Sequence, residues 1–524
     1  LRWMSTTSLL SETYCLVQLR FVLKKFFHPY RRSKIYWVFV QLTSLATPCY
    51  KLEKFIFITL ITYLLKPMKK FIPLLLVILF FGCKDDIDDT IVVAPTENLE
   101  VEDFIYKVMN FAYYWQKDVP NLADNKFVYD KEYTAFLQSF DGPKSLFSAL
   151  QFEDDKYSYI TDDYEAFENS VKGISLSNGM VFGLVRFSKD SPDIFSYVQY
   201  VLAGSDAKSK GVKRGDFFSH VNGTQLTVSN YRELLFSNAS SYTIDLATIN
   251  NNTITKTGSS ISLINTEQTE QSVHLSKVIQ HDGKKVGYVM YNSFVTSQDE
   301  ALKTAFADLA AAPIDELVVD LRYNRGGAIR TAQLLAGLIA GEHATKTFGK
   351  LVYNEKLSAN NSDVDITNSN INLGLSRVFF LTTQNSASAS EMTINGLKPY
   401  LNVVQIGDKT EGKDVGSNPF YDYIDSNRTK NPNHKYLLLP ITFKNYNSEG
   451  VGDYSEGLLP NISFPETLSN MGVLGDVEEP LLKKALEYIS GQTSGSISIN
   501  ANSLPASFIE LQTQAGKTIY FPKN

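Results

Sequence analysis

The stretch ELVVDLRYNRGGAIRTAQLLAGLIAG, residues 316–341, decides the fold of this chain. It opens with an apolar run of strand length, turns at Gly326 and Gly327, and continues with apolar residues at helical spacing. A buried strand, a glycine turn and a helix in this order are typical of an α/β layer structure. The glycine pair alone indicates only a turn, so its chemical meaning depends on the rest of the chain.

Strands and helices alternate throughout residues 270–490. KVGYVMYNSF (285–294) and RVFFLTT (377–383) are predicted strands, each followed by a predicted helix, and NVVQIG (402–407) is a further strand. We therefore expect a mixed α/β (α+β) core over residues 270–490.

Three small serines stand just before a predicted helix in TTQNSASASEMTINGL (382–397), at Ser386, Ser388 and Ser390. Ser388 and Glu391 have the S-x-x-E spacing of a capping box. A serine at a helix start also lies at the positive end of the helix dipole, beside a backbone N–H that is free to bind a developing oxyanion. Capping and nucleophilic chemistry are therefore compatible roles for Ser388.

A serine hydroxyl needs a base before it acts as a nucleophile. Among the histidines beyond residue 82, only His343, just after the helix of the glycine turn, is a candidate, and no motif supports it. A lysine can serve when burial lowers its pKa. Lys413 stands in the loop GDKTEGKDVGS (407–417), with Lys409 as a competitor, although a lysine in such a loop is usually solvated.

SASASE (386–391), preceded by DLRYNRGG (320–327) and followed by GDKTEGK (407–413), resembles the C-terminal processing peptidases, also called tail-specific proteases. This resemblance implies a serine peptidase with a Ser–Lys dyad, in which Ser388 is the nucleophile and Lys413 the general base. No Cys/His spacing of a metal site is visible, and we expect neither a metal nor another cofactor.

The resemblance also implies an oxyanion hole formed by the backbone N–H groups of Gly327 and Ala389, with Gly326 allowing the tight turn. Many members of the family carry a glutamine that holds the lysine in place, and Ser417 falls at that position here. Glu411 stands where an aromatic residue is common. Because an acidic group near the lysine favours the charged ammonium, we expect these departures to slow turnover.

Residues 171–255 consist of short predicted strands punctuated by glycines. GSDAKSKGVKRGDFFSHVNGTQLTVSNYRELLF (204–236) reads as a short helix, a turn, a strand, a hairpin turn at Asn222–Gly223 and a second helix. This order resembles a PDZ domain, which implies binding of a polypeptide C-terminus as an added strand. The loop that binds the terminal carboxylate is expected near SNGMVFGL (177–184).

MKKFIPLLLVILFFGC (68–83) has the charged start and short apolar core of an export signal. Its ending resembles a lipobox, which implies a signal peptide over 68–82 and lipidation of Cys83, an uncleaved N-terminal anchor being the alternative. Residues 1–67 are interpreted as upstream translation that is foreign to the protein. The remaining segments are an acidic tether over 83–98, a helical region over 99–170 that is capped at Asn98, and a Ser/Gly/Asn-rich tail over 491–524.

The bulk composition excludes several classes of protein. A chain of 524 residues with 44% hydrophobic and 20% charged residues is globular and too long for one compact domain. A net charge of -6 gives no reason to expect nucleic-acid binding. Because the only three cysteines are Cys15, Cys49 and Cys83, the chain beyond Cys83 cannot use disulfides.

These resemblances together imply a lipid-anchored, PDZ-containing serine endopeptidase of the cell envelope. Its substrates would be the C-terminal regions of unfolded or partly folded polypeptides. The alternative is a scaffold with a weak or inactive dyad that binds peptide tails through the PDZ groove.

Overall fold

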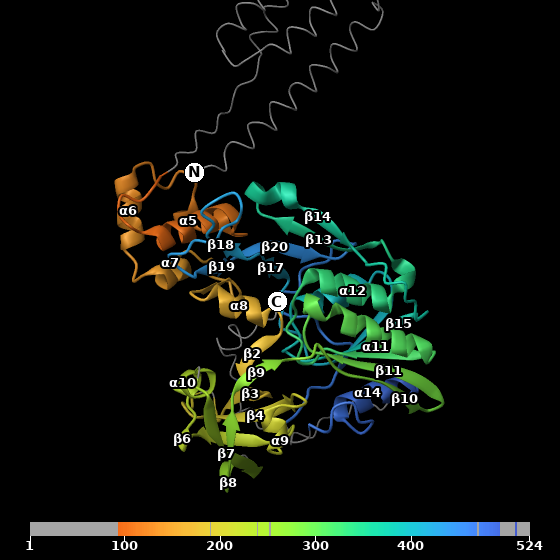
Figure 1. Cartoon of the computed structure of the whole chain (residues 1–524). Helices are drawn as coiled ribbons and strands as arrows, with labels where there is room; N and C mark the ends of the chain where they lie inside the picture. The colour runs from red at the N-terminus through yellow and green to blue at the C-terminus, as the bar shows by residue number, and fades with distance from the viewer. Residues whose placement is uncertain are drawn as a thin grey trace, which may run out of the picture. The chain divides into compact units, whose positions relative to one another are not determined.

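The computed structural model describes residues 93–492, apart from 189, 238, 251, 252, 469 and 470, together with the short strand Ile509–Glu510 (Figure 1). Residues Val93–Asp422 and Lys430–Asn524 form one compact unit, to which every feature below belongs. The predictions for residues 1–67, the signal peptide, Cys83 and most of the tether and tail lie outside the described residues. Within the described part of the chain, no helix is long and apolar enough to cross a bilayer.

The central sheet has six strands in the order β10-β11-β12-β15-β16-β21. They are β10 (Val273–His281), β11 (Lys284–Tyr291), β12 (Glu316–Asp320), β15 (Arg377–Thr382), β16 (Asn402–Gly407) and β21 (Ile462–Ser463). β10 is antiparallel to β11, and the other neighbouring pairs are parallel. The crossover helices are α11 (Asp299–Ala311), α12 (Ile329–Ile339) and α13 (Ala389–Leu397). The predicted α/β core is confirmed.

Both faces of this sheet are covered, which explains the continuous apolar run of β12. Leu317 and Val319 pack into the cluster that contains the buried side chains of α11, α12 and α13. Val318, on the opposite face, packs with α14 (Pro480–Ile489). Because β12 is packed on both faces, it is rigid and fixes the start of the loop that follows Asp320 and contains Gly326 and Gly327.

Residues 99–170 contain four α-helices and one strand of a small sheet. They are α5 (Glu100–Ala112), α6 (Asp130–Gln138), α7 (Pro143–Ala149), β1 (Tyr159–Thr161) and α8 (Tyr164–Ser170). The predicted cap at Asn98 is wrong, because α5 has Leu99 as its N-cap and no side-chain cap bond. Acidic residues in its first turn complement the positive end of the helix dipole instead.

β1 is joined to strands from late in the chain. It pairs antiparallel with β19 (Leu437–Leu439), and β19 pairs with β18 (Phe420–Tyr421). A neighbouring four-stranded sheet has the order β14-β13-β20-β17. Its strands are β13 (Thr347–Tyr353), β14 (Ser362–Asp365), β17 (Val415–Ser417) and β20 (Ile441–Tyr446). The described residues also contain the 3-10 turns η1 (Gln116–Asp118), η2 (Pro120–Leu122), η3 (Thr296–Gln298), η4 (Gly341–His343) and η5 (Glu355–Asn360).

A β-rich part lies between the helical region and the central sheet in sequence. Its strands are β2 (Ile174–Ser177), β3 (Met180–Arg186), β4 (Ile194–Val201), β5 (Phe217–Val221), β6 (Thr224–Gln225), β7 (Ser241–Asn250), β8 (Thr253–Ile264) and β9 (Thr266–Thr269), with helices α9 (Asp206–Ser209) and α10 (Tyr231–Phe236). Asn222 and Gly223 both have positive φ, at 51° and 75°, as the predicted hairpin turn requires. The strands continue beyond residue 255 to Thr269.

Candidate active site

The three sequence motifs meet because each follows the last residue of a parallel strand. DLRYNRGG begins at the end of β12, SASASE follows β15, and GDKTEGK begins at the end of β16. These strands are neighbours in the sheet. Parallel neighbours present their carboxyl ends at one edge, where open α/β sheets bind their ligands.

The structure distinguishes the three serines by exposure and hydrogen bonding. Ser386 and Ser390 are fully buried, and their hydroxyls donate to the carbonyls of Leu321 at 2.8 Å and Asn324 at 2.9 Å. Ser388 is half-buried. Ser386 and Ser390 therefore bind the segment to the loop that follows β12, and of the three serines only Ser388 is partly exposed to solvent.

Ser388 is the N-cap of α13 and has an unusual backbone conformation, with φ of 56° and ψ of -113°. A positive φ in a residue other than glycine is strained and persists only where the surroundings impose it. The conformation turns the chain sharply from β15 into the helix. The hydroxyl of Ser388 thus stands at the helix N-terminus, where the dipole favours negative charge.

The glycine pair packs directly against this turn. A Cβ atom on Gly326 would lie 2.8 Å from Cβ of Ser388 and 2.9 Å from the backbone nitrogen of Ala389. Gly326 and Gly327 have φ of 104° and 142°. Close approach, as well as the turn, therefore requires glycine here.

Two backbone N–H groups remain available beside Ser388. Gly326 N–H is engaged, since it donates to Oδ1 of Asn324 at 2.8 Å. Within the described residues, the N–H groups of Gly327 and Ala389 donate to no other protein group. Free backbone N–H groups in a turn that packs against a partly exposed hydroxyl are donors that can serve an oxyanion.

Glu391 joins the serine segment to the lysine loop through one fully buried carboxylate. Its Oε2 accepts the N–H groups of Ser388 and Lys413, each at 2.8 Å, so those two nitrogens are no more than twice that distance apart. Its Oε1 accepts the hydroxyl of Thr410 at 2.6 Å and the N–H of Gly412 at 2.7 Å. Burial raises the pKa of Glu391 to about 7, although these hydrogen bonds oppose the shift.

Sequence reasoning assigned Glu391 only a capping role. The contact from its carboxylate to the N–H of Ser388 confirms that half of the capping box. Its other contacts lie on a loop that begins after the next strand. The S-x-x-E spacing could not reveal them.

Lys413 is buried, with 5% of its surface exposed. Burial lowers its pKa to about 8, and the nearby charges of Glu391, Asp155 and Glu411 oppose this shift. The acidic neighbour anticipated at Glu411 is therefore present, but desolvation outweighs it. The competitor Lys409 is only half-buried.

Tyr157, from the segment between α7 and β1, was not among the predicted site residues. Its ring centroid lies 5.4 Å from Nζ of Lys413. Ser417, the residue at the family's glutamine position, has a buried hydroxyl that makes no hydrogen bond within the described residues. The lysine is thus covered from the N-terminal helical region, a contact between segments far apart in sequence.

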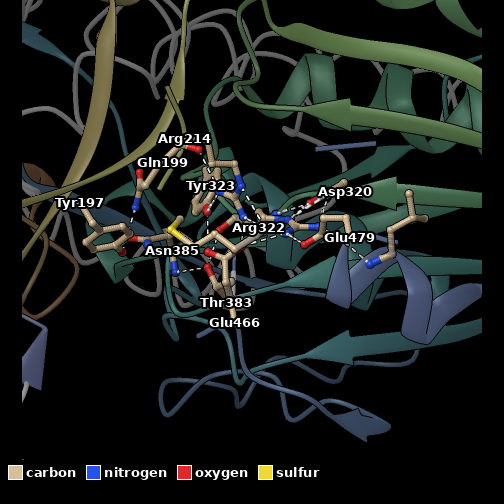
Figure 2. A network of polar contacts seen from close by, with 12 residues as sticks. Tyr197, Gln199, Arg214, Asp320, Arg322, Tyr323, Thr383, Asn385, Glu466 and Glu479 are labelled. Atoms are coloured by element: carbon tan, nitrogen blue, oxygen red, sulfur yellow. Dashed lines mark hydrogen bonds and ion pairs between the residues drawn. The ribbon is translucent and has the colours of Figure 1, made fainter. Parts of the chain in front are cut away.

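The loop after β12 is anchored by a buried ionic network (Figure 2). The guanidinium of Arg322, which is fully buried, pairs with Asp320, with Glu466 at 2.9 Å and with Glu479 at 2.7 Å. Arg214 of the β-rich part also pairs with Glu466. The network fixes the backbone just before the glycine pair. It also connects the β-rich part to this loop, because Arg214 and Arg322 share the carboxylate of Glu466.

Two histidines, His343 and His434, have partners away from Ser388. The ring of His343 lies 5.1 Å from that of Tyr400, and Nε2 of His434 lies 3.0 Å from Asp422. No described contact joins either of them to Ser388. Within the described residues, no group of three or more potential metal ligands occurs.

Comparison with known proteins gives one family. The profile described as Peptidase family S41 matches residues 285–444, and that described as Peptidase S41 N-terminal domain matches residues 100–159. Ser388, Lys413 and Gly327 fall within the first match, and the β-rich part lies between the two.

A solved structure of a protein assigned to the S41 proteases, from Bacteroides fragilis NCTC 9343, is 28% identical to this chain. The similarity covers 74% of this chain and 97% of that one, with a TM-score of 0.59. The Probable CtpA-like serine protease of Staphylococcus aureus (strain COL) is 24% identical over 322 residues, or 61% of this chain. The match spans 57% of the length of that curated relative.

Proposed function

We propose that this chain, which its matches relate to peptidase family S41, is a serine endopeptidase with Ser388 as nucleophile and Lys413 as general base. The observation that carries the proposal is the carboxylate of Glu391, which holds the backbone of both residues at 2.8 Å. The strained, half-buried serine and the buried lysine beside it supply the chemistry that such a pair needs.

The dyad would work through the uncharged amine of Lys413. With a pKa of about 8, about a tenth of the amine is neutral at pH 7. The amine accepts the proton of Ser388 while Oγ attacks the peptide carbonyl. The developing oxyanion accepts hydrogen bonds from the backbone N–H groups of Gly327 and Ala389. The ammonium then returns the proton to the leaving amine, and water hydrolyses the acyl-enzyme with the lysine again as base.

The β-rich part supports a polypeptide substrate bound through its C-terminal region. Most of the stretch predicted as the carboxylate-binding loop (177–184) is strand β3 (Met180–Arg186), and β3 pairs antiparallel with the short strand Ile509–Glu510. An edge that pairs with an extended segment matches the way in which PDZ domains add a ligand strand. The lipid anchor at Cys83 and a place in the cell envelope rest on the sequence of residues 68–83 alone.

Cleavage of an unstructured protein with an apolar C-terminus tests the proposal. The parent should cleave it, Ser388→Ala and Lys413→Ala should not, and Lys409→Ala should retain cleavage as the matched lysine control. Loss of cleavage in Lys409→Ala alone would transfer the role of base to that residue. Tail-dependent binding without cleavage by all four proteins would support the scaffold instead.

A further inference from the structure

The segment that precedes β1 reaches the general base from the N-terminal helical region. Tyr157 lies in this segment, and its ring centroid is 5.4 Å from Nζ of Lys413, within the range of a cation–π contact. The same tyrosine packs against two apolar clusters, one built on the helical region and one on β19. The ring is therefore part of the wall that separates the amine from solvent.

The segment is fixed on both sides of the tyrosine. Oδ1 of Asp155 accepts the N–H groups of Tyr157 at 2.8 Å and Ser158 at 2.9 Å, and its Oδ2 accepts the hydroxyl of Tyr113 at 2.7 Å. The hydroxyl of Ser158 accepts the N–H of Ile441 on β20 at 2.8 Å. These hydrogen bonds fix the backbone on both sides of Tyr157, and the backbone in turn determines where the ring lies.

The phenol itself is neutral at working pH. Burial and the charges of Glu411, Glu391, Asp414 and Glu456 raise the pKa of Tyr157 above its ordinary value. It cannot compete with Lys413 as a base, and it adds no charge to the site. What it supplies is a ring face and the exclusion of water.

We propose that Tyr157 is the positioning residue of Lys413, because its ring holds the amine in place and excludes water from it. Tyr157 precedes Lys413 in the sequence, whereas the glutamine position of the family, here Ser417, follows it. The glutamine position offers no such support, because the hydroxyl of Ser417 makes no hydrogen bond within the described residues. This inference rests on the proposed function, since it assigns a partner to the proposed base. It also makes the N-terminal helical region a necessary part of the catalytic site.

The pKa of Lys413 provides a readout that a merely structural role would not move. The charged groups that face Lys413 are Glu391, Asp155 and Glu411, and all three raise its pKa. Removing the ring by Tyr157→Ala admits water, which raises the pKa, and removes the cation–π contact, which lowers it. Because desolvation is the largest cause of the shift in Lys413, the net change should be a rise towards the ordinary lysine value by about one pH unit or more. Tyr157→Phe keeps the ring and should leave the value unchanged.

Competitive acetylation of lysines in the full chain, quantified by mass spectrometry between pH 6 and pH 11, measures this pKa without requiring catalysis. Tyr159→Ala removes a neighbouring tyrosine of the same segment and serves as the matched control. The expected result is an alkaline shift in Tyr157→Ala, a smaller one in Tyr157→Leu, and none in Tyr157→Phe or Tyr159→Ala. A pKa that stays the same in both Tyr157→Ala and Tyr157→Leu would overturn the inference.

Cleavage kinetics over the same pH range separate the inference from the proposed function. In an active parent, the alkaline shift should appear in kcat/KM with KM changed by less than about twofold. A parent that cleaves nothing, together with the expected acetylation shift, would refute the peptidase and leave the tyrosine–lysine contact standing. A uniform fall in kcat at every pH, with no shift, would show that Tyr157 only stabilises the fold.

Discussion

Replacing Glu391 by glutamine tests the carboxylate that joins the two halves of the site. Each of its oxygens accepts two hydrogen bonds, from the N–H groups of Ser388 and Lys413 and from the donors of Thr410 and Gly412. Glutamine keeps the shape but presents an NH2 group to one of these donor pairs. Two buried donors then lose their acceptor at about 1–3 kcal/mol each, so the free energy of unfolding should fall by at least about 2 kcal/mol at pH 8.

The pH dependence of this loss has a definite sign. Burial raises the pKa of Glu391 to about 7 in the folded protein, against 4.5 for an ordinary glutamate. Between these values the folded protein holds a proton that the unfolded chain releases, so this group makes the parent less stable as pH rises through the window. The difference corresponds to roughly 3 kcal/mol, which glutamine does not show. The stability gap between parent and variant should therefore be wider at pH 5 than at pH 8.

Urea unfolding followed by tryptophan fluorescence at pH 5 and pH 8 measures both quantities. Glu456→Gln replaces an exposed glutamate and should change the free energy of unfolding by less than about 0.5 kcal/mol at either pH. Other titrating groups are shared by parent and variant and cancel in the comparison. A gap that is constant or widens towards pH 8 would show that burial does not hold the carboxyl of Glu391 in its protonated form.

Three further outcomes follow from the site. Gly326→Ala should lower kcat/KM at least about 100-fold, because the added methyl lies 2.8 Å from Cβ of Ser388, the proposed nucleophile. Gly283→Ala, at a position with a positive φ but open space, should keep parental kcat/KM and thereby separate the clash from backbone strain. The value of kcat/KM should rise about tenfold per pH unit below pH 8 as Lys413 loses its proton, in the parent and in Lys409→Ala alike, and an acid optimum would contradict a lysine base. Arg322→Met should lower the free energy of unfolding by about 3–5 kcal/mol in thermal melts, because three carboxylates lose their buried partner; a loss below about 1 kcal/mol would show that the network is not structural.

The fold of the core was accessible from the sequence because its signals are local. ELVVD reads as a strand buried on both faces, and Gly326 and Gly327 mark the turn that follows it. The same logic locates the serine segment at the end of β15 and the lysine loop at the end of β16. Parallel neighbours then bring the three loops together without any knowledge of side-chain contacts.

The parts that were not accessible depend on contacts between distant segments. The capping role of Glu391 is visible in its spacing from Ser388, but its bonds to the lysine loop require the register between β15 and β16. Tyr157 reaches Lys413 only because β1 pairs with β19, and nothing in its local sequence marks it. The expected cap at Asn98 is wrong although its signal is local, because α5 has the next residue, Leu99, as its N-cap. Acidic residues in the first turn provide the favourable charge there.

The pairing of β1 with β19 makes the aromatic cover of Lys413 depend on a strand that is synthesised late. A ribosome delivers Tyr157 early and the partner strand Leu437–Leu439 only after the serine and lysine segments have emerged. Until that late strand arrives, the amine of Lys413 has no aromatic cover, stays hydrated and keeps its proton. A chain that lacks the strand Leu437–Leu439 should therefore keep the proposed base charged and the proposed dyad inactive.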